Sequence, residues 1–289
     1  MNKSIKRILQ IKREDIYLKR ILLAIKGRLT QIPHVLLYYS PFKFYVENRN
    51  RLAKYQDIHK GKRCFVIANG PSLKNIDFNL LKDEYTIGMN RVYLMKEQNG
   101  FMPNYLACID VKSQILQFHE EMDQLDIPCF FNFRLRHKFS KKRNQYFILG
   151  RFSSEFSTDI TKKRFGNGKS VTYTAIQLAF QMGFSEVYLI GKDHFYKTKA
   201  AAGVGIKSDG NEDNHFIKGY YKPGQNWDAP DYASEEFAYK LAREAFEKSG
   251  RVIKDATIDG KLNVFEKIDF YSLFNDRSEE RRVGKECTI

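Results

Sequence analysis

The stretch RCFVIANGPSLKNID, residues 63–77, joins an apolar run to an abrupt polar break. Its first part, Cys64–Ala68, is short, continuous and apolar, which predicts a buried strand. The residues NGPS at 69–72 interrupt that run, and proline is favoured in the first turn of a helix. We therefore predict a strand that passes through a tight turn directly into a helix.

Short apolar runs of the same kind recur along the chain, separated by helical patterns. The strands predicted from them are Tyr85–Met89, Tyr105–Ile109, Cys129–Phe133, Val187–Ile190 and Val252–Ile253. The clearest helical patterns are Thr172–Met182 and Ser234–Lys248. Alternating strands and helices predict an α/β fold, with a Rossmann-like, mostly parallel sheet and helices on both faces.

Three regions of the chain differ in composition. The 289 residues carry a formal net charge of +15, but residues 1–57 alone hold 13 Lys or Arg against 4 Asp or Glu. Residues 58–276 contain the alternating pattern and are predicted to form one catalytic domain. Residues 277–289, RSEERRVGKECTI, change character sharply and are interpreted as a non-native tail.

The N-terminal region predicts a helical, basic arm. Its apolar residues fall near helical spacing among lysines and arginines: Ile5, Ile8, Leu9, Ile16, Ile21, Leu22 and Ile25. Such a helix can lie on an anionic membrane surface, and an equally open alternative is a solvated helix packed on the body. No nucleic-acid-binding motif accompanies the charge, so we expect no nucleic-acid partner.

Cysteine usage and the length of apolar runs bear on the compartment. Four cysteines are scattered without metal-type spacing, which favours reduced thiols: Cys64, Cys108, Cys129 and Cys287. We find no signal-peptide pattern and no apolar run long enough to span a membrane. These features predict a cytoplasmic protein, with peripheral attachment to the inner membrane through residues 1–57 left open.

The first predicted strand ends in residues suited to a ligand. In a parallel sheet, ligands bind beyond the carboxyl ends of the strands. Here Gly70 lets a ligand approach the backbone closely, Ser72 offers a hydroxyl, and free N–H groups at a helix start favour phosphate. The turn matches neither GxGxxG nor GxxxxGK[ST]. A nucleotide phosphate is the predicted occupant, and an ordinary strand-to-helix turn is the alternative.

Three further strand ends add polar residues to the same edge, namely Asn90, Asp110 and Asp193. Each has a purely structural alternative, because Asn and Asp commonly cap turns and helices. A lone histidine such as His194 or His215 is likewise often structural. The joint placement of these residues, and not any one of them, predicts a binding site.

Five segments together resemble the MptE-like (DUF115) proteins of bacterial surface-polysaccharide loci, across residues 58–275. They are FVIANGPSLKNID, GMNRVYL, SVTYTAIQLAFQMGFSEVYLIGKDHFY, NEDNHFIKGYY and DATIDGKLNVFEKIDF. More distantly, the segments are similar to the family 42 sialyltransferases. Those proteins have a GNGPS turn, an Asn after the second strand, an SGxDFY-type strand end and an NSHYIG-type segment.

The resemblance implies an enzyme that transfers a sugar from a nucleotide-activated donor to a glycan acceptor, CMP being the nucleotide in the sialyltransferases. The nucleotide-binding residues that it implies are Asn69, Gly70, Ser72, Asn90, Ser170 and Asp193. His215 matches the catalytic base, and Tyr196 matches a tyrosine that assists the leaving phosphate. The implied transfer is inverting and requires no metal or other cofactor. An imidazole with a pKa near neutrality would suit the base.

Other interpretations stay open. The archaeal namesakes of the family transfer pyrophosphate from ATP to a hydroxymethylpterin, which would need Mg²⁺ held by Asp110 and Asp193. A nucleotide-binding scaffold without enzymatic activity is a third class. The loop at 197–214 is either a lid or an ordinary surface loop, and Trp227 is either a platform for a sugar ring or a packing residue.

Overall fold

The computed structural model describes residues 29–151, 153–159, 164–197, 200–211 and 213–275, together with residues 25 and 27. Most of the expected basic arm and the expected tail at 277–289 lie outside the described residues. The chain divides into two compact units, residues 1–46 and residues 47–289. No helix among the described residues is long and apolar enough to cross a membrane.

The first unit contains one complete described helix, α3 (Ile32–Tyr39), with a proline in its first turn. Tyr38 is its buried residue, whereas Ile32, Leu36 and Tyr39 are exposed. These three positions are spaced by four and three residues, so they share one face of the helix. The next helix, α4 (Lys43–Ala53), crosses the division between the units.

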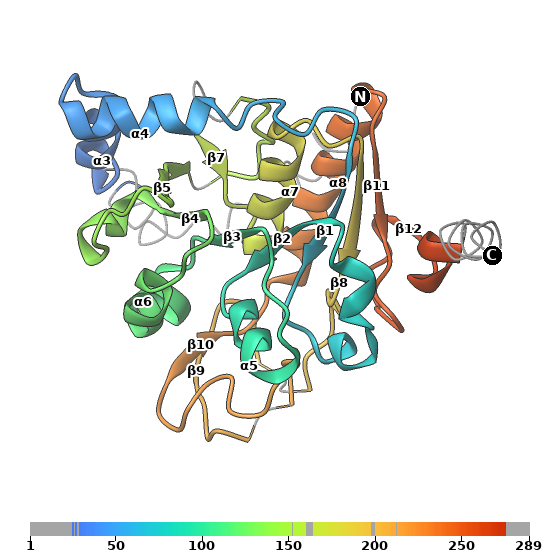
Figure 1. Ribbon diagram of the computed structural model, residues 1–289. Helices are drawn as coiled ribbons and strands as arrows, with labels where there is room; N and C mark the ends of the chain where they lie inside the picture. The colour runs from blue at the N-terminus through green and yellow to red at the C-terminus, as the bar shows by residue number, and fades with distance from the viewer. Residues whose placement is uncertain are drawn as a thin grey trace, which may run out of the picture. The chain divides into compact units, whose positions relative to one another are not determined.

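The second unit is built on an eight-stranded sheet in the order β12-β11-β8-β1-β2-β3-β4-β5 (Figure 1). Every neighbouring pair in it is parallel, as predicted. Its strands are β1 (Arg63–Ile67), β2 (Tyr85–Met89), β3 (Tyr105–Cys108), β4 (Cys129–Asn132), β5 (Gln145–Ile148), β8 (Glu186–Ile190), β11 (Val252–Asp255) and β12 (Glu266–Lys267). The sequence pattern did not predict β5 or β12.

Two small sheets accompany the large one. A parallel pair joins β6 (Gly150–Arg151) to β7 (Phe165–Gly166). An antiparallel pair joins β9 (Gly205–Lys207) to β10 (Asn226–Asp228). The described part of the loop at 197–214 therefore contains a strand.

The longer helices are α7 (Val171–Gln181) and α8 (Tyr232–Lys248), close to their predicted bounds. The shorter ones are α5 (Met95–Asn99), α6 (Leu116–Asp123) and a π-helical turn, η5 (Val111–Ile115). Short 3₁₀ helices are η2 (Pro71–Asn75), η3 (Phe78–Leu81), η4 (Val92–Leu94), η6 (Phe133–Lys138) and η7 (Tyr271–Phe274). The helix expected after β1 is thus a 3₁₀ turn, η2, and not an α-helix.

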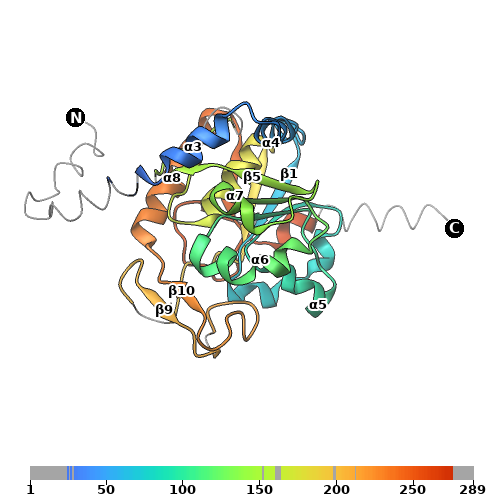
Figure 2. The same ribbon diagram turned by 90° about the vertical axis from the view of Figure 1, so that its left-hand side faces the viewer.

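Strand β1 shows how the sheet is buried on both faces. Cys64 and Val66 belong to the core that α7 and α8 cover, and those two helices pack against each other (Figures 1 and 2). Phe65 points to the opposite face, where it stacks on Phe274 of η7 with ring centroids 5.7 Å apart. Alternate residues of one strand therefore serve two cores, which explains its continuous apolar run.

The direction in which the chain winds reverses beside β1. The chain adds β2 to β5 in order on one side of β1, and later adds β8, β11 and β12 on the other side. This is a topological switch point, where loops diverge from the carboxyl ends of two adjacent parallel strands and leave a crevice. The fold therefore places a binding site beyond β1 and β8.

Candidate active site

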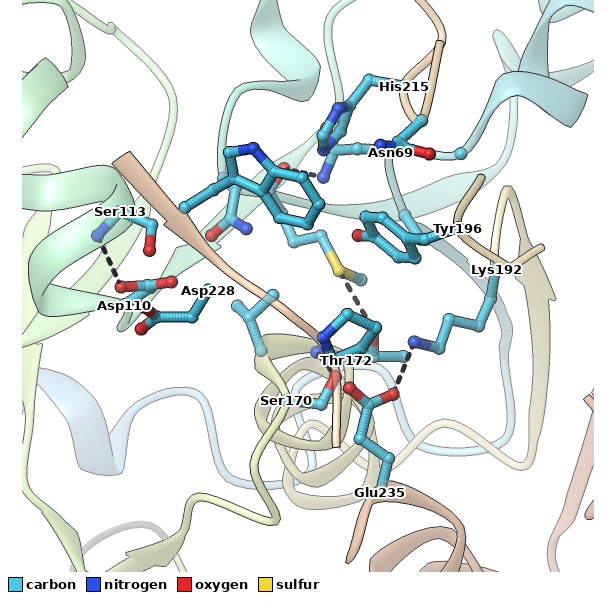
Figure 3. Close-up of a pocket in the computed structure, with 18 of the residues that line it drawn as sticks. Asn69, Asp110, Ser113, Ser170, Thr172, Lys192, Tyr196, His215, Asp228 and Glu235 are labelled. Atoms are coloured by element: carbon cyan, nitrogen blue, oxygen red, sulfur yellow. Dashed lines mark hydrogen bonds and ion pairs between the residues drawn. The ribbon is translucent and has the colours of Figure 1, made fainter. Parts of the chain in front are cut away.

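A cavity of about 410 Å³ lies at this switch point (Figure 3). Among the predicted site residues, Ser72 does not line it, but the others do: Asn69, Gly70, Asn90, Asp110, Ser170, Asp193, Tyr196 and His215. Four strand ends, the start of α7 and the segment around His215 thus meet at one place. The sequence pattern correctly predicted that these segments converge, although it could not give the contacts between them.

Asp193 occupies the position that we had predicted for a phosphate. Its carboxylate accepts hydrogen bonds from the backbone N–H of Ser72 at 3.1 Å and from the Ser72 hydroxyl at 2.7 Å. Burial raises the pKa of Asp193, and the bonds from Ser72 oppose that rise. A Cβ atom on Gly70 would lie 1.8 Å from the Asp193 carboxylate, so Gly70 is required by this side chain whether or not a ligand binds.

Two asparagines at adjacent strand ends present amide oxygens that are buried and unpaired. The Asn69 amide nitrogen donates to the Met89 carbonyl at 3.0 Å, which directs its Oδ1 away from that strand. Asn90 has a left-handed backbone, with φ of 51°. Within the described part of the chain, neither Oδ1 atom has a hydrogen-bond partner. Each is therefore available to a ligand that donates hydrogen bonds.

Helix α7 begins at the cavity. Ser170 is its N-cap, and its hydroxyl oxygen accepts from the Thr172 N–H at 3.2 Å. The Tyr239 hydroxyl from α8 donates to the same Ser170 oxygen at 2.9 Å. Lys169, which precedes the cap, also lines the cavity. This eleven-residue helix directs the positive end of its dipole toward the cavity.

An ion pair that the sequence analysis missed lies beside the same helix start. Lys192 and Glu235 approach to 2.8 Å, and their side chains are only 13% and 6% exposed. Burial alone would lower the pKa of Lys192, but the Glu235 carboxylate outweighs it and the pKa is raised. The two residues are 43 positions apart, so only the packing of α8 against the end of β8 brings them together.

His215 is buried among aromatic rings. Its imidazole stacks on Tyr220 with centroids 3.9 Å apart, and Tyr196 meets it edge-on at 6.1 Å. Burial, with a smaller contribution from the Arg91 charge, lowers the pKa of His215 to about 3. The near-neutral pKa that we expected for this imidazole is therefore wrong. The ring is neutral, and its Nδ1 has no hydrogen-bond partner among the described residues.

Tyr196 lies between His215 and Trp227. Its ring stacks on the Trp227 indole with centroids 5.5 Å apart. Burial raises the pKa of Tyr196 to about 12, against the opposing charge of Lys192, so its hydroxyl stays protonated at neutral pH and can donate a hydrogen bond. Trp227 is buried and lines the cavity, so it packs on a predicted site residue and faces the ligand space as well.

The described acidic residues at the cavity are Asp110, Asp193, Asp228, Asp231 and Glu235. Asp110 caps η5 by accepting the Ser113 N–H at 3.0 Å, and Figure 3 shows it next to Asp228 of β10. Asp193, the other candidate for Mg²⁺, is bonded to Ser72. Within the described residues, no group of three or more His, Cys, Asp or Glu side chains could hold a metal ion. A metal would need ligands from water or substrate in addition to these carboxylates.

A polar cavity at the switch point of a parallel sheet defines the broad class of doubly wound α/β proteins, which bind their ligands there. Within that class, residues 42–199 match the family model described as 6-hydroxymethylpterin diphosphokinase MptE-like. The matched region is more than half of the chain, which therefore belongs to the MptE-like family. No curated protein matches the chain.

Solved structures of glycosyltransferases are distantly similar to this fold. The MAf glycosyltransferase from Magnetospirillum magneticum AMB-1 is 14% identical, with a TM-score of 0.46; the match covers 81% of this chain and 40% of that one. The sialyltransferase CstII from Campylobacter jejuni, solved with cytidine-5'-monophosphate, is 12% identical, with a TM-score of 0.45, covering 72% and 85%. A mammalian sialyltransferase is 12% identical, with a TM-score of 0.33, covering 77% and 81%. The distant similarity predicted from the sequence is confirmed.

Proposed function

We propose that this protein is a glycosyltransferase that moves a sugar from a nucleotide-activated donor to a glycan acceptor, with inversion and without a metal. The observation that carries the proposal is the meeting of Tyr196 and His215, with ring centroids 6.1 Å apart, at a cavity that four strand ends also line. The sequence resemblance gives Tyr196 the role of hydrogen-bond donor to the leaving phosphate. It gives His215 the role of catalytic base.

The cavity offers separate surroundings for the parts of such a donor. The nucleoside would lie against Asn69 and Asn90, whose free amide oxygens accept from hydroxyl or amino groups. The phosphate would lie toward Ser170 and the start of α7, because a helix N-terminus favours an anion. The sequence had suggested that the backbone N–H of Ser72, in η2, would bind the phosphate. In the structure this N–H donates to Asp193, so we assign Asp193 a positioning role.

The chemical step needs one proton acceptor and one proton donor. The acceptor hydroxyl attacks the anomeric carbon of the donor sugar, a new carbon–oxygen bond forms, and the bond from that carbon to the phosphate oxygen breaks. The hydroxyl proton passes to the His215 imidazole. The protonated Tyr196 hydroxyl donates a hydrogen bond to the departing phosphate. Loss of a general base typically costs about 10²–10⁴-fold in rate.

The lowered pKa of His215 is compatible with this role once a donor is bound. A nearby negative charge favours the protonated imidazole, so a nucleotide phosphate raises the pKa of a histidine beside it. The base would therefore become stronger when a donor binds. This arrangement couples proton transfer to donor binding.

The setting that we propose is the cytoplasmic side of a bacterial membrane, in surface-polysaccharide synthesis. The sequence resemblance to proteins of polysaccharide loci supports the pathway. The basic residues within 1–57 and the exposed apolar face of α3, formed by Ile32, Leu36 and Tyr39, support contact with an anionic lipid surface.

A thermal-shift panel of the full chain against CMP, CDP, UDP, GDP and ATP, each with and without Mg²⁺, tests the proposal. A ligand at about 100 times its Kd stabilises the folded state by about 2.7 kcal/mol, which is readily seen as a higher midpoint. We expect a metal-independent shift with a sugar-carrier nucleotide. Among the conjugates of that nucleotide, one should then support transfer that His215→Gln abolishes while nucleotide binding persists.

Two other outcomes point elsewhere. The family description favours pyrophosphate transfer from ATP as a second candidate, and the neighbouring Asp110 and Asp228 are the carboxylates that would orient hydrated Mg²⁺ for it. A shift seen only with ATP and Mg²⁺ would support that activity. Nucleotide binding by a protein that transfers nothing would instead indicate a scaffold.

A further inference from the structure

Acceptor atoms dominate one side of the cavity. Gln114, which lines it, is 2% exposed, and its amide nitrogen donates to the Tyr221 hydroxyl. Its Oε1 atom, like Oδ1 of Asn69 and of Asn90, finds no hydrogen-bond donor in the part of the chain that the structure describes. A buried polar atom left unsatisfied is destabilising, and a bound ligand with donor groups would remove that cost.

Two carboxylates stand beside these amide oxygens. Asp110 lies four residues before Gln114, and Figure 3 shows Asp228 of β10 next to Asp110. Burial raises the pKa of Asp110, and the negative charge of Asp228 raises it further, against the opposing Ser113 N–H bond. The two side chains are thus close enough to interact electrostatically, which adds four more acceptor oxygens to this side.

The position of Asp228 is fixed by hydrogen bonds from outside the cavity. The Gln117 amide nitrogen donates to the Asn226 carbonyl at 2.7 Å, and the Asn226 N–H donates back to the Gln117 oxygen at 3.0 Å. This reciprocal pair ties β10 to α6. The backbone of β10 is therefore held against α6 two residues before Asp228, whose own side chain is exposed.

The cations around the cavity do not compensate for these acceptors. Lys192 is already paired with Glu235 at 2.8 Å, and Figure 3 draws that pair on the far side of the cavity from Asp110. Lys169 stands at the start of α7, where the phosphate is proposed to bind. His215 is neutral. An anionic group placed beside Asp110 would therefore meet oxygen atoms of like partial or full charge.

We infer that the donor sugar bears no carboxylate, and that its hydroxyl or ammonium groups donate hydrogen bonds to Asp110, Asp228 and Gln114. The inference rests on the proposed function, because it takes the cavity to hold a nucleotide-sugar. The substrate class of the donor sugar is therefore neutral hexoses and amino sugars. It excludes sialic and uronic acids as donors.

Isothermal titration of the full chain with UDP, UDP-glucose, UDP-glucosamine and UDP-glucuronic acid tests this, with CMP and CMP-sialic acid as a second series. We expect glucose or glucosamine to strengthen binding over the free nucleotide, and glucuronate or sialate to weaken it. Asp228→Asn should improve the relative affinity for the carboxylate-bearing donor about tenfold, equivalent to about 1.4 kcal/mol. Asp259→Asn, an exposed carboxylate that does not line the cavity, is the matched control and should change nothing.

The outcomes separate the two hypotheses. If a nucleotide binds but its carboxylate-bearing conjugate binds more tightly than the neutral one, the inference is wrong and the proposed function stands. If Asp228→Asn leaves the discrimination unchanged while the protein stays folded, Asp228 is not its source and the inference is likewise overturned. If neither these compounds nor any nucleotide of the thermal-shift panel binds, the proposed function fails and the inference falls with it.

Discussion

The imidazole of His215 lies flat on the phenol ring of Tyr220, with centroids 3.9 Å apart and ring planes within 2°. Tyr220 is in turn held by Arg91, whose backbone N–H donates to the phenol oxygen at 3.2 Å and whose guanidinium bonds the Tyr220 carbonyl. Arg91 directly follows Asn90 at the end of β2. The end of β2 therefore does two things: Arg91 fixes the position of the proposed base, and Asn90 is a proposed nucleotide-binding residue.

The lowered pKa of His215 predicts a pH-dependent stability. The unfolded histidine takes up a proton near pH 6.5, but the folded one does so only near pH 3, so acid favours the unfolded state between these values. The contribution of His215 to the free energy of unfolding is retained above pH 6.5. Below pH 6.5 that contribution falls by up to about 1.4 kcal/mol per pH unit. His215→Phe keeps a ring on Tyr220 and should show a shallower fall in urea unfolding between pH 6 and pH 4. An unchanged slope would contradict the buried neutral imidazole.

Donor binding should shift the same group in the opposite direction. A phosphate near the imidazole favours its charged form, so the pKa of His215 should rise when a nucleotide binds. Histidine ring resonances followed by NMR across a pH titration, with and without the nucleotide found in the panel, measure this directly. The resonances are assigned with His215→Phe. A pKa that stays near its unliganded value in the complex would remove His215 as the base.

Gly70 should tolerate no side chain while Asp193 is present. A Cβ atom there would lie 1.8 Å from the Asp193 carboxylate oxygen and 2.6 Å from the Gly191 carbonyl. Gly70→Ala is expected to cost about 1–3 kcal/mol in unfolding free energy. The cost should be smaller in an Asp193→Ala background, where the nearer contact is gone, with a coupling of at least about 0.5 kcal/mol. Gly27→Ala is the control, because nothing lies within 4 Å of its Cβ position.

The Lys192–Glu235 pair predicts an asymmetric response to substitution. Glu235→Ala leaves a buried ammonium without its partner and should cost about 3–5 kcal/mol in urea unfolding. Replacing both residues by methionine should cost clearly less, since no unpaired charge remains. Glu247→Ala, which removes a salt bridge whose side chains are 43% and 64% exposed, should cost under about 0.5 kcal/mol. Equal costs for the single and double replacements would show that the pair is not the source of the effect.

The sequence predicted six of the eight strands of the sheet. Five of them are short, largely buried apolar runs, whereas β11 was predicted from Val252 and Ile253 alone, although Val252 is exposed. It missed β5 (Gln145–Ile148), which begins with polar residues, and β12, which has only two residues. It placed Asn69, Asn90, Asp110 and Asp193 at one edge correctly, since strand ends of a parallel sheet share an edge. That much follows from periodicity and topology alone.

The contacts inside the site were not predictable in the same way. Asp193 bonds Ser72 across 121 positions, and no local pattern distinguishes a carboxylate that caps a distant turn from one that binds a ligand. Asp228 lines the cavity from β10, a strand that Gln117 of α6 bonds at Asn226, 109 positions away. Such pairings depend on how loops pack after the sheet has formed, so they carry no signature in a single sequence.

The exposed apolar face of α3 predicts attachment to lipid. Leu36 is 67% exposed, and Phe42, close after the helix, is 64% exposed. Replacing both by serine removes apolar area that a membrane would bury, so binding to vesicles of phosphatidylcholine and phosphatidylserine in a sedimentation assay should fall about tenfold. Phe237→Ser on α8, which removes an aromatic ring that is 46% exposed, is the matched control. Because basic residues within 1–57 would add an electrostatic contribution, raising the salt concentration should weaken binding of the unmodified chain. Binding that survives the double replacement and resists salt would mean that this face meets another partner.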